Sequence, residues 1–278
     1  MSDFSREALD QQFESRRHTS FDISGTLYAP GDKPIHLEID AKPRKLNVDH
    51  RVLVCIHGSH SSAFEYADVA EALGTSDESV ARISTSRHHD FDPMSNQPFA
   101  SEDGNDYRTT GFRGKTYEME VEDVRKAIRE LVQRSEEWFG VPASRLRFDL
   151  LGTSLGAVIA AELSAEFGSQ IDRLVLASPP SHVEKSSVTL LDTFPSRETF
   201  LEPLASFPGK VTVMRGGMDS LVSNEDAQAF VHASSHARFV ELPDAGHTFG
   251  LFDFEQPQEQ RERTRQTFLN LLRTQLDS

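Results

Sequence analysis

The sequence predicts an α/β fold in which a β-hairpin leads into a mostly parallel sheet covered by helices on both sides. Short, continuously apolar segments alternate along the chain with longer amphipathic ones, which is typical of strands joined by helical crossovers. Two short runs near the N-terminus are separated by turn residues, as in a hairpin. With 278 residues, the chain is of ordinary length for one domain of this class.

We expect the first part of the chain to divide into a leader and a hairpin. Residues 1–20 are charged and predict an N-terminal leader, and residues 21–278 predict a single domain. The runs Phe21–Tyr28 and Ile35–Ala41 flank the turn residues Pro30, Gly31 and Asp32. This arrangement favours two antiparallel strands.

Six short apolar segments follow the hairpin. Because they are apolar on both faces, they are typical of central strands in a parallel sheet, where both faces are covered. They are Val52–Ile56, Val80–Ile83, Leu146–Leu151, Leu174–Ala177, Val211–Met214 and Phe239–Leu242. Parallel strands joined in this way require right-handed crossover connections.

Amphipathic segments between the strands predict the helices. Between Thr116 and Phe139, apolar residues recur at spacings of three and four and would share one face: Val121, Val124, Ile128, Leu131 and Val132. Ala157–Phe167 is a second helical run. In the last segment Phe268, Leu271 and Leu272 share a face in the same way.

Two further segments fit neither pattern. Residues 86–114 are polar, rich in turn residues and too long for a routine connection, which predicts a rim loop. Residues 179–209 mix apolar and polar side chains and predict one or two short helices that form a small lid. Both segments would leave the carboxyl ends of strands, where ligands bind in sheets of this class.

The strongest chemical motif is Gly152-Thr153-Ser154-Leu155-Gly156, which lies between an apolar strand and a helical run. A serine on so sharp a turn has a strained backbone, and side chains two residues away on either side would collide. The N–H of Leu155 would point, at the helix N-terminus, towards a developing oxyanion.

A serine hydroxyl needs a base, and the base needs an acid that orients it. His247 follows the penultimate predicted element and precedes the last helix, while Asp219 follows the strand Val211–Met214. Asp244 also lies near His247 in sequence. Three residues away along a tight turn, however, it does not easily reach the far nitrogen of the imidazole, which favours Asp219.

With this serine, acid and base order, the chain from Arg51 to Gln275 resembles the α/β-hydrolase superfamily. The resemblance implies an eight-stranded, mostly parallel sheet with the catalytic residues at its carboxyl edge. It implies that Ser154 is the nucleophile, Asp219 the acid and His247 the base, and it requires no metal or other cofactor. No motif in the sequence selects a subfamily.

The resemblance also covers His57 and Gly58, which directly follow the strand Val52–Ile56. In this superfamily the loop after that strand supplies the second oxyanion-hole N–H, here from Ser59 or, as the less favoured choice, His60. His57 would orient this loop or simply pack as a structural histidine. His60 would face the pocket or be solvated.

Other charged and polar clusters have simpler explanations. The run from His88 to Asp92 (His-His-Asp-Phe-Asp) contains metal-ligand types, but adjacent histidines rarely converge on one ion, so a solvated loop is favoured. Cys55, in the middle of a strand, is expected to be buried and unreactive.

A small basic group lies in the acidic chain and could meet an anionic substrate at the pocket rim. It consists of Arg108, Arg113 and Lys115. The favoured alternative is a charged loop in which these residues pair with nearby acids, namely Asp103, Asp106 and Glu118.

Composition narrows the classes of partner. The net charge of −15 argues against nucleic acid, because phosphate backbones are bound by basic surfaces. No apolar run approaches the length of a membrane span, and the polar N-terminus lacks the apolar region of a secretory signal. One cysteine excludes an internal disulfide. We therefore expect a soluble, cytoplasmic protein, and the sequence leaves its oligomeric state open.

The predicted function is that of a serine hydrolase that cleaves a carboxylic ester or a related acyl bond in a small molecule through an acyl-enzyme. Thioesterase, lactonase, C–C hydrolase and acyl-peptidase activities are alternatives on the same fold. A ligand-binding or protein-interaction role without catalysis is the alternative from a different class.

Overall fold

The computed structural model describes most of the chain. The described residues are 23–29, 33–42, 48–59, 61–73, 78–86, 112, 114–184, 189–251 and 257–277. The expected leader (1–20), the turn from Pro30 to Asp32 and most of the expected rim loop (87–111 and 113) lie outside them. The division into leader, domain, rim loop and lid therefore stays a prediction.

Within the described residues, eight strands form one sheet in the order β1-β2-β4-β3-β5-β6-β7-β8. The pairs β1–β2 and β2–β4 are antiparallel, and the other neighbours run parallel. The strands are β1 (Ile23–Ala29), β2 (Lys33–Asp40), β3 (His50–Ile56), β4 (Ser79–Ser84), β5 (Leu146–Thr153), β6 (Ile171–Ala177), β7 (Lys210–Gly216) and β8 (Ala237–Leu242). The prediction of a hairpin that leads into a mostly parallel, eight-stranded sheet is confirmed.

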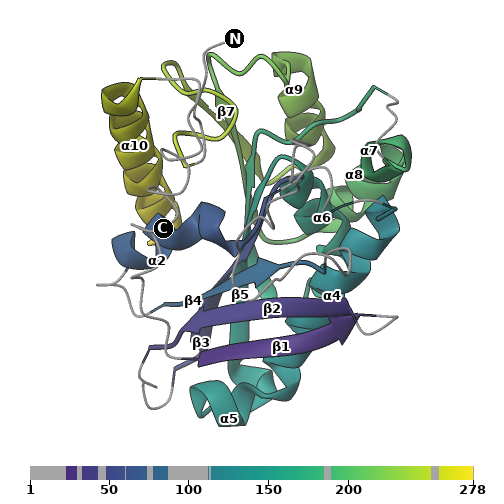
Figure 1. Cartoon of the computed structure of the whole chain (residues 1–278), viewed down its shortest axis with the longest axis vertical. Helices are drawn as coiled ribbons and strands as arrows, with labels where there is room; N and C mark the ends of the chain where they lie inside the picture. Colours follow the sequence, from purple (N-terminus) through teal and green to yellow (C-terminus); the bar gives the residue numbers. More distant parts are fainter. Residues whose placement is uncertain are drawn as a thin grey trace, which may run out of the picture.

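Helices cover both faces of this sheet (Figure 1). Helices α2 (Ala67–Ala72) and α10 (Gln258–Leu276) lie on one face. The other face is covered by α4 (Tyr117–Gln133), α6 (Leu155–Leu163), α8 (Glu198–Ser206) and α9 (Asn224–Ala233). The remaining short helices are η1 (Ala63–Tyr66), α5 (Ser135–Phe139), η2 (Ala143–Arg145) and α7 (Thr189–Asp192).

The two-residue repeat of a strand explains why β3 is apolar from Val52 to Ile56. Along β3, Val52, Val54 and Ile56 point into the core that contains α4 and α6. The intervening Leu53 and Cys55 point into the core that contains α2 and α10. Cys55 is fully buried, as predicted, and burial raises the pKa of its thiol far above the ordinary value.

The prediction that Phe239–Leu242 forms a central strand is wrong. This segment belongs to β8, which is the last strand in the sheet order and pairs only with β7. Arg238 and Glu241 on β8 are exposed, and of its six residues only Leu242 is buried. An edge strand lacks a neighbour on one side, so half-exposed side chains are tolerated there.

Two predicted helices end earlier than their apolar pattern suggests. The segment from Thr116 to Phe139 forms two helices that meet at Arg134, whose backbone leaves the helical conformation. Thr116 caps the first helix through its side chain. The run Ala157–Phe167 is helical only as far as Leu163, after which the Ser164 hydroxyl donates to the Ala161 carbonyl 2.6 Å away. Such local bonds compete with continued helix.

Lys115 belongs to a buried ionic cluster and is therefore not available to an anionic substrate. Its ammonium donates to Asp123 at 2.7 Å, to the Ser86 carbonyl at 2.7 Å and lies 3.1 Å from Glu120. Asp123 also accepts hydrogen bonds from the N–H and hydroxyl of Ser86. The expected pairing with Glu118 is wrong, because burial forces Lys115 to the acids on the inner face of α4. Arg108, Arg113, Asp103 and Asp106 lie outside the described residues.

Replacing Lys115 by methionine is expected to lower the free energy of unfolding by about 3–5 kcal/mol. The change leaves two buried carboxylates without their cation, which is far more costly than the loss of an exposed pair. Urea unfolding would measure it, with Lys126→Met on the exposed face of α4 as a control whose effect should stay within about 0.5 kcal/mol. Equal effects of the two substitutions would contradict this account of the cluster.

Candidate active site

Ser154 lies on the sharp turn between β5 and α6, at the carboxyl edge of the sheet. Its backbone has φ 50° and ψ −118°, in the left-handed half of conformational space that a residue other than glycine rarely adopts. The turn is held by hydrogen bonds from the Ser154 N–H to the Ala177 carbonyl (2.8 Å) and from the Ala157 N–H to the Ser154 carbonyl (3.0 Å). Strain of this kind is what a nucleophile elbow requires.

Backbone crowding explains both glycines of the motif. A Cβ atom on Gly152 would lie 2.3 Å from the Gly156 carbonyl oxygen, and one on Gly156 would lie 2.1 Å from the carbonyl oxygen of Ile56. Any other residue would push β5, α6 and β3 apart. The predicted collision of side chains two residues from the serine is therefore found on both sides.

The structure brings Asp219 and His247 together. Asp219 follows β7 and His247 follows β8, and the His247 Nδ1 lies 3.0 Å from Asp219 Oδ2. The other carboxylate oxygen of Asp219 accepts hydrogen bonds from the N–H groups of Leu221 and Val222, each at 2.9 Å. Asp244, the alternative acid, is exposed. The geometry thus favours Asp219 as the partner of the imidazole.

The environment of Asp219 favours its ionised form. Burial of the side chain opposes ionisation, but the hydrogen bond and charge of His247 and the hydrogen bond from the Val222 N–H outweigh it, so the pKa of Asp219 is below its ordinary value. An ionised Asp219 accepts a hydrogen bond from Nδ1–H, which keeps the proton on Nδ1 and leaves Nε2 of His247 free to act as a base.

Arg215 holds the loop that carries the acid, and the sequence analysis did not identify it. Its guanidinium donates to the carbonyl oxygens of Val222 (3.0 Å) and Asp219 (3.1 Å) and lies 3.3 Å from Glu241 on β8. The signal was an arginine that directly follows the apolar run Val211–Met214. It braces the turn from within the sheet.

His57 orients the peptide that carries the predicted second oxyanion N–H. Its Nδ1 lies 2.7 Å from the Gly58 carbonyl, and its Nε2 lies 3.2 Å from the Thr85 N–H. Since a backbone N–H only donates, Nε2 is the acceptor and Nδ1 carries the proton. The Gly58 carbonyl and the Ser59 N–H belong to one peptide group, so this bond sets the direction of the Ser59 N–H. His60 lies outside the described residues.

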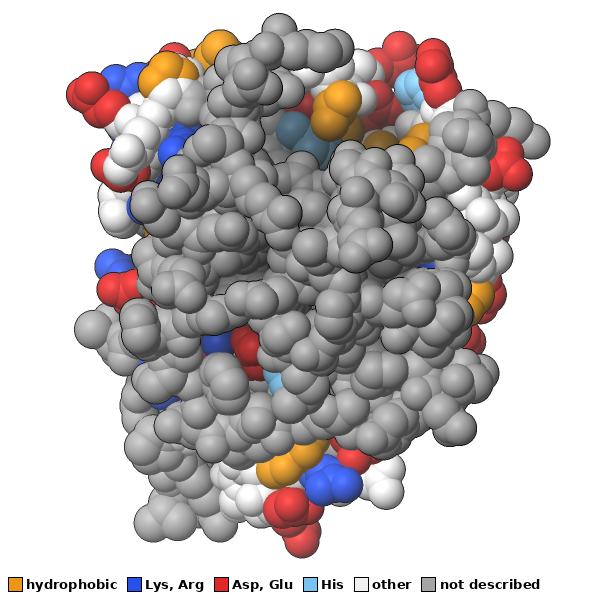
Figure 2. All heavy atoms as spheres, viewed as in Figure 1, with side chains coloured by type: hydrophobic (Ala, Val, Ile, Leu, Met, Phe, Trp, Pro, Cys, Tyr) orange, Lys and Arg blue, Asp and Glu red, His pale blue; other side chains and the backbone are white. Residues whose placement is uncertain are grey.

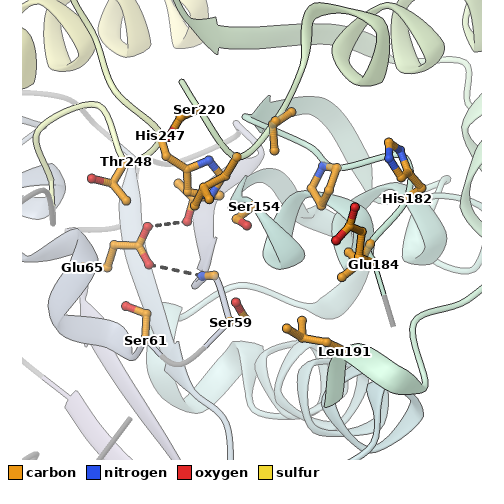
Figure 3. A pocket seen from close by; sticks show the side chains of 16 residues that line it. Ser59, Ser61, Glu65, Ser154, His182, Glu184, Leu191, Ser220, His247 and Thr248 are labelled. Atoms are coloured by element: carbon orange, nitrogen blue, oxygen red, sulfur yellow. Dashed lines mark hydrogen bonds between the residues drawn. The ribbon is translucent and has the colours of Figure 1, made fainter. Parts of the chain in front are cut away.

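Glu65 is a second residue that the sequence analysis did not single out. It is almost fully buried on η1, and its carboxyl group contacts the N–H of Gly58 at 3.2 Å and the hydroxyl of Thr153. Figure 3 shows both contacts as dashed lines. Glu65 is the only Asp, Glu, Lys or Arg between Arg51 and Asp68, and this isolation was the signal.

These groups surround a cavity of about 730 Å³. Figure 3 shows Ser154 and His247 in this cavity, with Glu65 on one side and His182 and Glu184 on the other. The lining residues are Gly58, Ser59, Ser61, Glu65, Thr153, Ser154, Pro180, His182, Val183, Glu184, Leu191, Ser220, Leu221, Val222, His247 and Thr248. Leu155 is the first residue of α6, so its N–H has no partner within the helix.

In the described part of the chain, the Ser154 hydroxyl makes no hydrogen bond to His247. The two side chains line the same cavity. In structures without substrate, catalytic hydrogen bonds are often long and tighten only in the complex.

Part of the expected lid segment forms one wall of the cavity. His182 is exposed there, and its Nδ1 lies 2.8 Å from Asp226 on α9. Burial opposes the ionisation of Asp226, but hydrogen bonds from Ser181 and Ser223 outweigh it and lower its pKa to about 2. Ser223 and Asp226 also form a capping box at the start of α9. Asp226 thus fastens this wall to α9.

Figure 2 shows Asp and Glu side chains around the edges of the face it presents, in keeping with the net charge. Among the described residues, no three or more His, Cys, Asp or Glu side chains gather as metal ligands would, and no helix is long and apolar enough to cross a membrane. The run from His88 to Asp92 lies outside these residues.

Solved structures resemble the chain in fold. A thioesterase domain from the curacin biosynthetic pathway aligns with a TM-score of 0.61 at 16% identity, over 91% of this chain and 99% of that one. An esterase from Pyrococcus furiosus aligns with a TM-score of 0.60 at 17% identity, over 93% of this chain and 94% of the esterase. An α/β serine hydrolase homologue from Coxiella burnetii aligns with a TM-score of 0.56 at 17% identity, over 91% of this chain and 98% of that one. No protein-family model and no curated protein matches the sequence.

Proposed function

We propose that this chain, which has the α/β-hydrolase fold, is a serine hydrolase that cleaves a carboxylic ester or a related acyl bond in a small molecule. The observation that carries the proposal is the placement of Ser154. It occupies a strained turn and faces one cavity together with a histidine that is hydrogen-bonded to a buried carboxylate. The esterase and thioesterase names of the structural neighbours support a hydrolase.

In the proposed reaction the Ser154 hydroxyl attacks the substrate carbonyl and gives its proton to Nε2 of His247. The imidazolium that forms is stabilised by Asp219, which accepts the hydrogen bond from Nδ1. His247 then returns the proton to the leaving group. Water activated by the same ring hydrolyses the acyl-enzyme, and Ser154 regains its proton.

The oxyanion of each tetrahedral intermediate is received by the N–H groups of Leu155 and Ser59. The first belongs to the free N-terminus of α6, and the second to the peptide oriented by His57. Each donor of this kind contributes about 3 kcal/mol to stabilisation of the transition state. All of these steps use side chains and backbone groups of this chain.

The size of the cavity supports a small-molecule substrate. A volume of about 730 Å³ lies within the range of small-ligand sites. Its wall combines apolar side chains such as Leu191 and Val222 with hydroxyls such as Ser61 and Thr248. Thioesters, lactones, activated C–C bonds and acylated peptides are the alternative substrates for the same chemistry.

We expect the protein to react with a fluorophosphonate and to hydrolyse p-nitrophenyl esters, with a chain-length profile from acetyl to palmitoyl that measures the acyl pocket. Mass spectrometry should locate the label in the tryptic peptide 148–173, which contains Ser154. Protein unfolded in urea before labelling is the control. If the protein is labelled but hydrolyses none of these esters, thioesters, lactones and peptides would be tested as substrates next. Neither labelling nor turnover would favour a ligand-binding or protein-interaction role.

A further inference from the structure

A chain of hydroxyl groups connects Glu65 to the backbone of β3. The Tyr66 hydroxyl lies 2.8 Å from the Ile56 carbonyl oxygen and 2.9 Å from Thr153 Oγ1, and Thr153 Oγ1 contacts Glu65 Oε1. All four residues are buried. Three oxygen–oxygen contacts therefore run in series, and each needs one proton to be a hydrogen bond.

Counting protons favours one protonation state of the Glu65 carboxyl group. The hydroxyls of Tyr66 and Thr153 supply one proton each, and the Ile56 carbonyl supplies none. An ionised Glu65 would leave one of the three contacts as two oxygens facing each other without a proton. A neutral Glu65 supplies the third proton, so that Glu65 donates to Thr153, Thr153 to Tyr66 and Tyr66 to Ile56.

The second oxygen of Glu65 is satisfied in this state as well. Oε2 accepts the Gly58 N–H at 3.2 Å, and a neutral carboxyl group keeps an acceptor for this bond. Burial independently raises the pKa of Glu65 above its ordinary value, although the ionised form would accept hydrogen bonds from Thr153, Gly58 and Ser61, which work in the opposite direction.

The position of this carboxyl group connects it with catalysis. Gly58 directly precedes Ser59, the proposed oxyanion donor, and Thr153 directly precedes Ser154. Glu65 thus joins the two backbone segments whose spacing sets the oxyanion hole. A negative charge here would oppose the oxyanion and compete with Asp219 for the charged His247, which faces the same cavity.

We propose that Glu65 is a positioning residue that works as a neutral carboxylic acid. It holds the Gly58 loop against the Thr153 turn, and its ionisation weakens the oxyanion hole. The catalytic part of this inference rests on the proposed hydrolase activity, whereas the protonation state follows from the hydrogen-bond count alone.

The charged and titratable groups that face Glu65 come from several elements. His247 approaches it from the loop after β8, Cys55 from β3 and Tyr66 from η1 itself. A charged His247 favours ionisation of Glu65, while Cys55 and Tyr66 stay neutral because burial raises the pKa of each. Among Glu65, Cys55 and Tyr66, Glu65 is therefore the side chain whose ionisation adds a negative charge as the pH rises.

The protonation state is tested by stability, without any substrate. Glutamine mimics a neutral carboxyl group, because its amide donates to Thr153 and its oxygen accepts from Gly58. The native wild type holds a proton on Glu65 that the unfolded chain has lost, so stability falls with pH from the unfolded pKa of about 4.3 up to the raised folded pKa. The difference in Tm between Glu65→Gln and wild type should grow across this window. A difference that does not change with pH would overturn the neutral state.

The positioning role is tested by the pH dependence of kcat with the best substrate found for the wild type. The ratio of kcat for Glu65→Gln to kcat for wild type should be near one at low pH and rise by on the order of tenfold towards about pH 9. Glu65→Ala should lower kcat by about 100-fold at every pH with little change in KM, because the two segments are no longer joined. A flat ratio for the glutamine variant, or full activity of the alanine variant, would overturn the role.

Glu162→Gln is the matched control. Glu162 on α6 is a second carboxyl group whose pKa is raised by burial, and it is hydrogen-bonded to Tyr117 away from the cavity. Its pH profile should equal that of wild type, and a profile like that of Glu65→Gln would overturn the inference. If wild type neither hydrolyses acyl substrates nor reacts with a fluorophosphonate, the hydrolase proposal fails, while the Tm series still decides the state of Glu65.

Discussion

Replacing Ser154 by alanine is expected to lower kcat for the best acyl substrate by on the order of 10⁶-fold, while the protein still folds and binds that substrate. The loss is large because the serine, histidine and aspartate act as one unit. Removal of the nucleophile alone therefore removes nearly all of the rate enhancement that the three residues supply together. Residual turnover above that of water would come from the oxyanion hole and substrate binding. Steady-state kinetics, with fluorophosphonate labelling in parallel, would measure it.

Ser220→Ala is a suitable comparison for this variant. Ser220 also lies on the cavity wall and directly follows Asp219 in sequence, but it has no part in the proposed reaction. Its activity should stay close to that of wild type. Substantial turnover by Ser154→Ala, with label still incorporated, would place the nucleophile elsewhere and end the present assignment.

Replacing Asp219 by asparagine is expected to lower kcat by about 10⁴-fold with little change in the fold. The amide keeps the shape of the side chain, and its oxygen can still accept the N–H groups of Leu221 and Val222. Its NH₂ group would face Nδ1 of His247, however, and would favour the tautomer that carries its proton on Nε2. A ring in that state does not accept the proton of Ser154.

Asp244→Asn provides the control for the choice of acid. Asp244 is exposed and lies only three residues from His247 in sequence, so it is the residue that proximity alone would select. This variant should keep kcat within about threefold of wild type, as expected for an exposed substitution. If Asp244→Asn were the more damaging of the two, the acid would be Asp244.

The strand segments and the serine turn were predictable because their causes are local. Short segments that are largely apolar favour strands of a covered sheet, and the six segments after the hairpin are all strands of this sheet, the last of them at its edge. The motif around Ser154 combines glycines and a serine between a strand and a helix, and the backbone there has the strained geometry that this pattern implies. Asp219 and His247 were selected as candidates by their positions after strands, since parallel strands end at one edge, and the structure brings these two side chains together.

Other features depend on which segments become neighbours, and this is a property of the whole sheet. Phe239–Leu242 was predicted to be a central strand, yet its place at the edge follows from the order in which the strands pair. The sequence favoured pairing of Lys115 with acids close to it in the chain, such as Glu118, whereas the fold places Asp123 and Glu120 beside it. The local sequence around each residue does not predict these neighbours.

Glu65 shows this division most clearly. By itself the sequence determined the sheet, the serine turn and the candidate acid and base, because hydrophobic pattern and turn chemistry act over a few residues. Only the tertiary structure decided that Glu65 meets Gly58 from one segment and Thr153, 88 residues away, from another. The proton it holds is set by hydroxyl groups that folding brings together, because a buried polar group takes the charge state that its partners can satisfy.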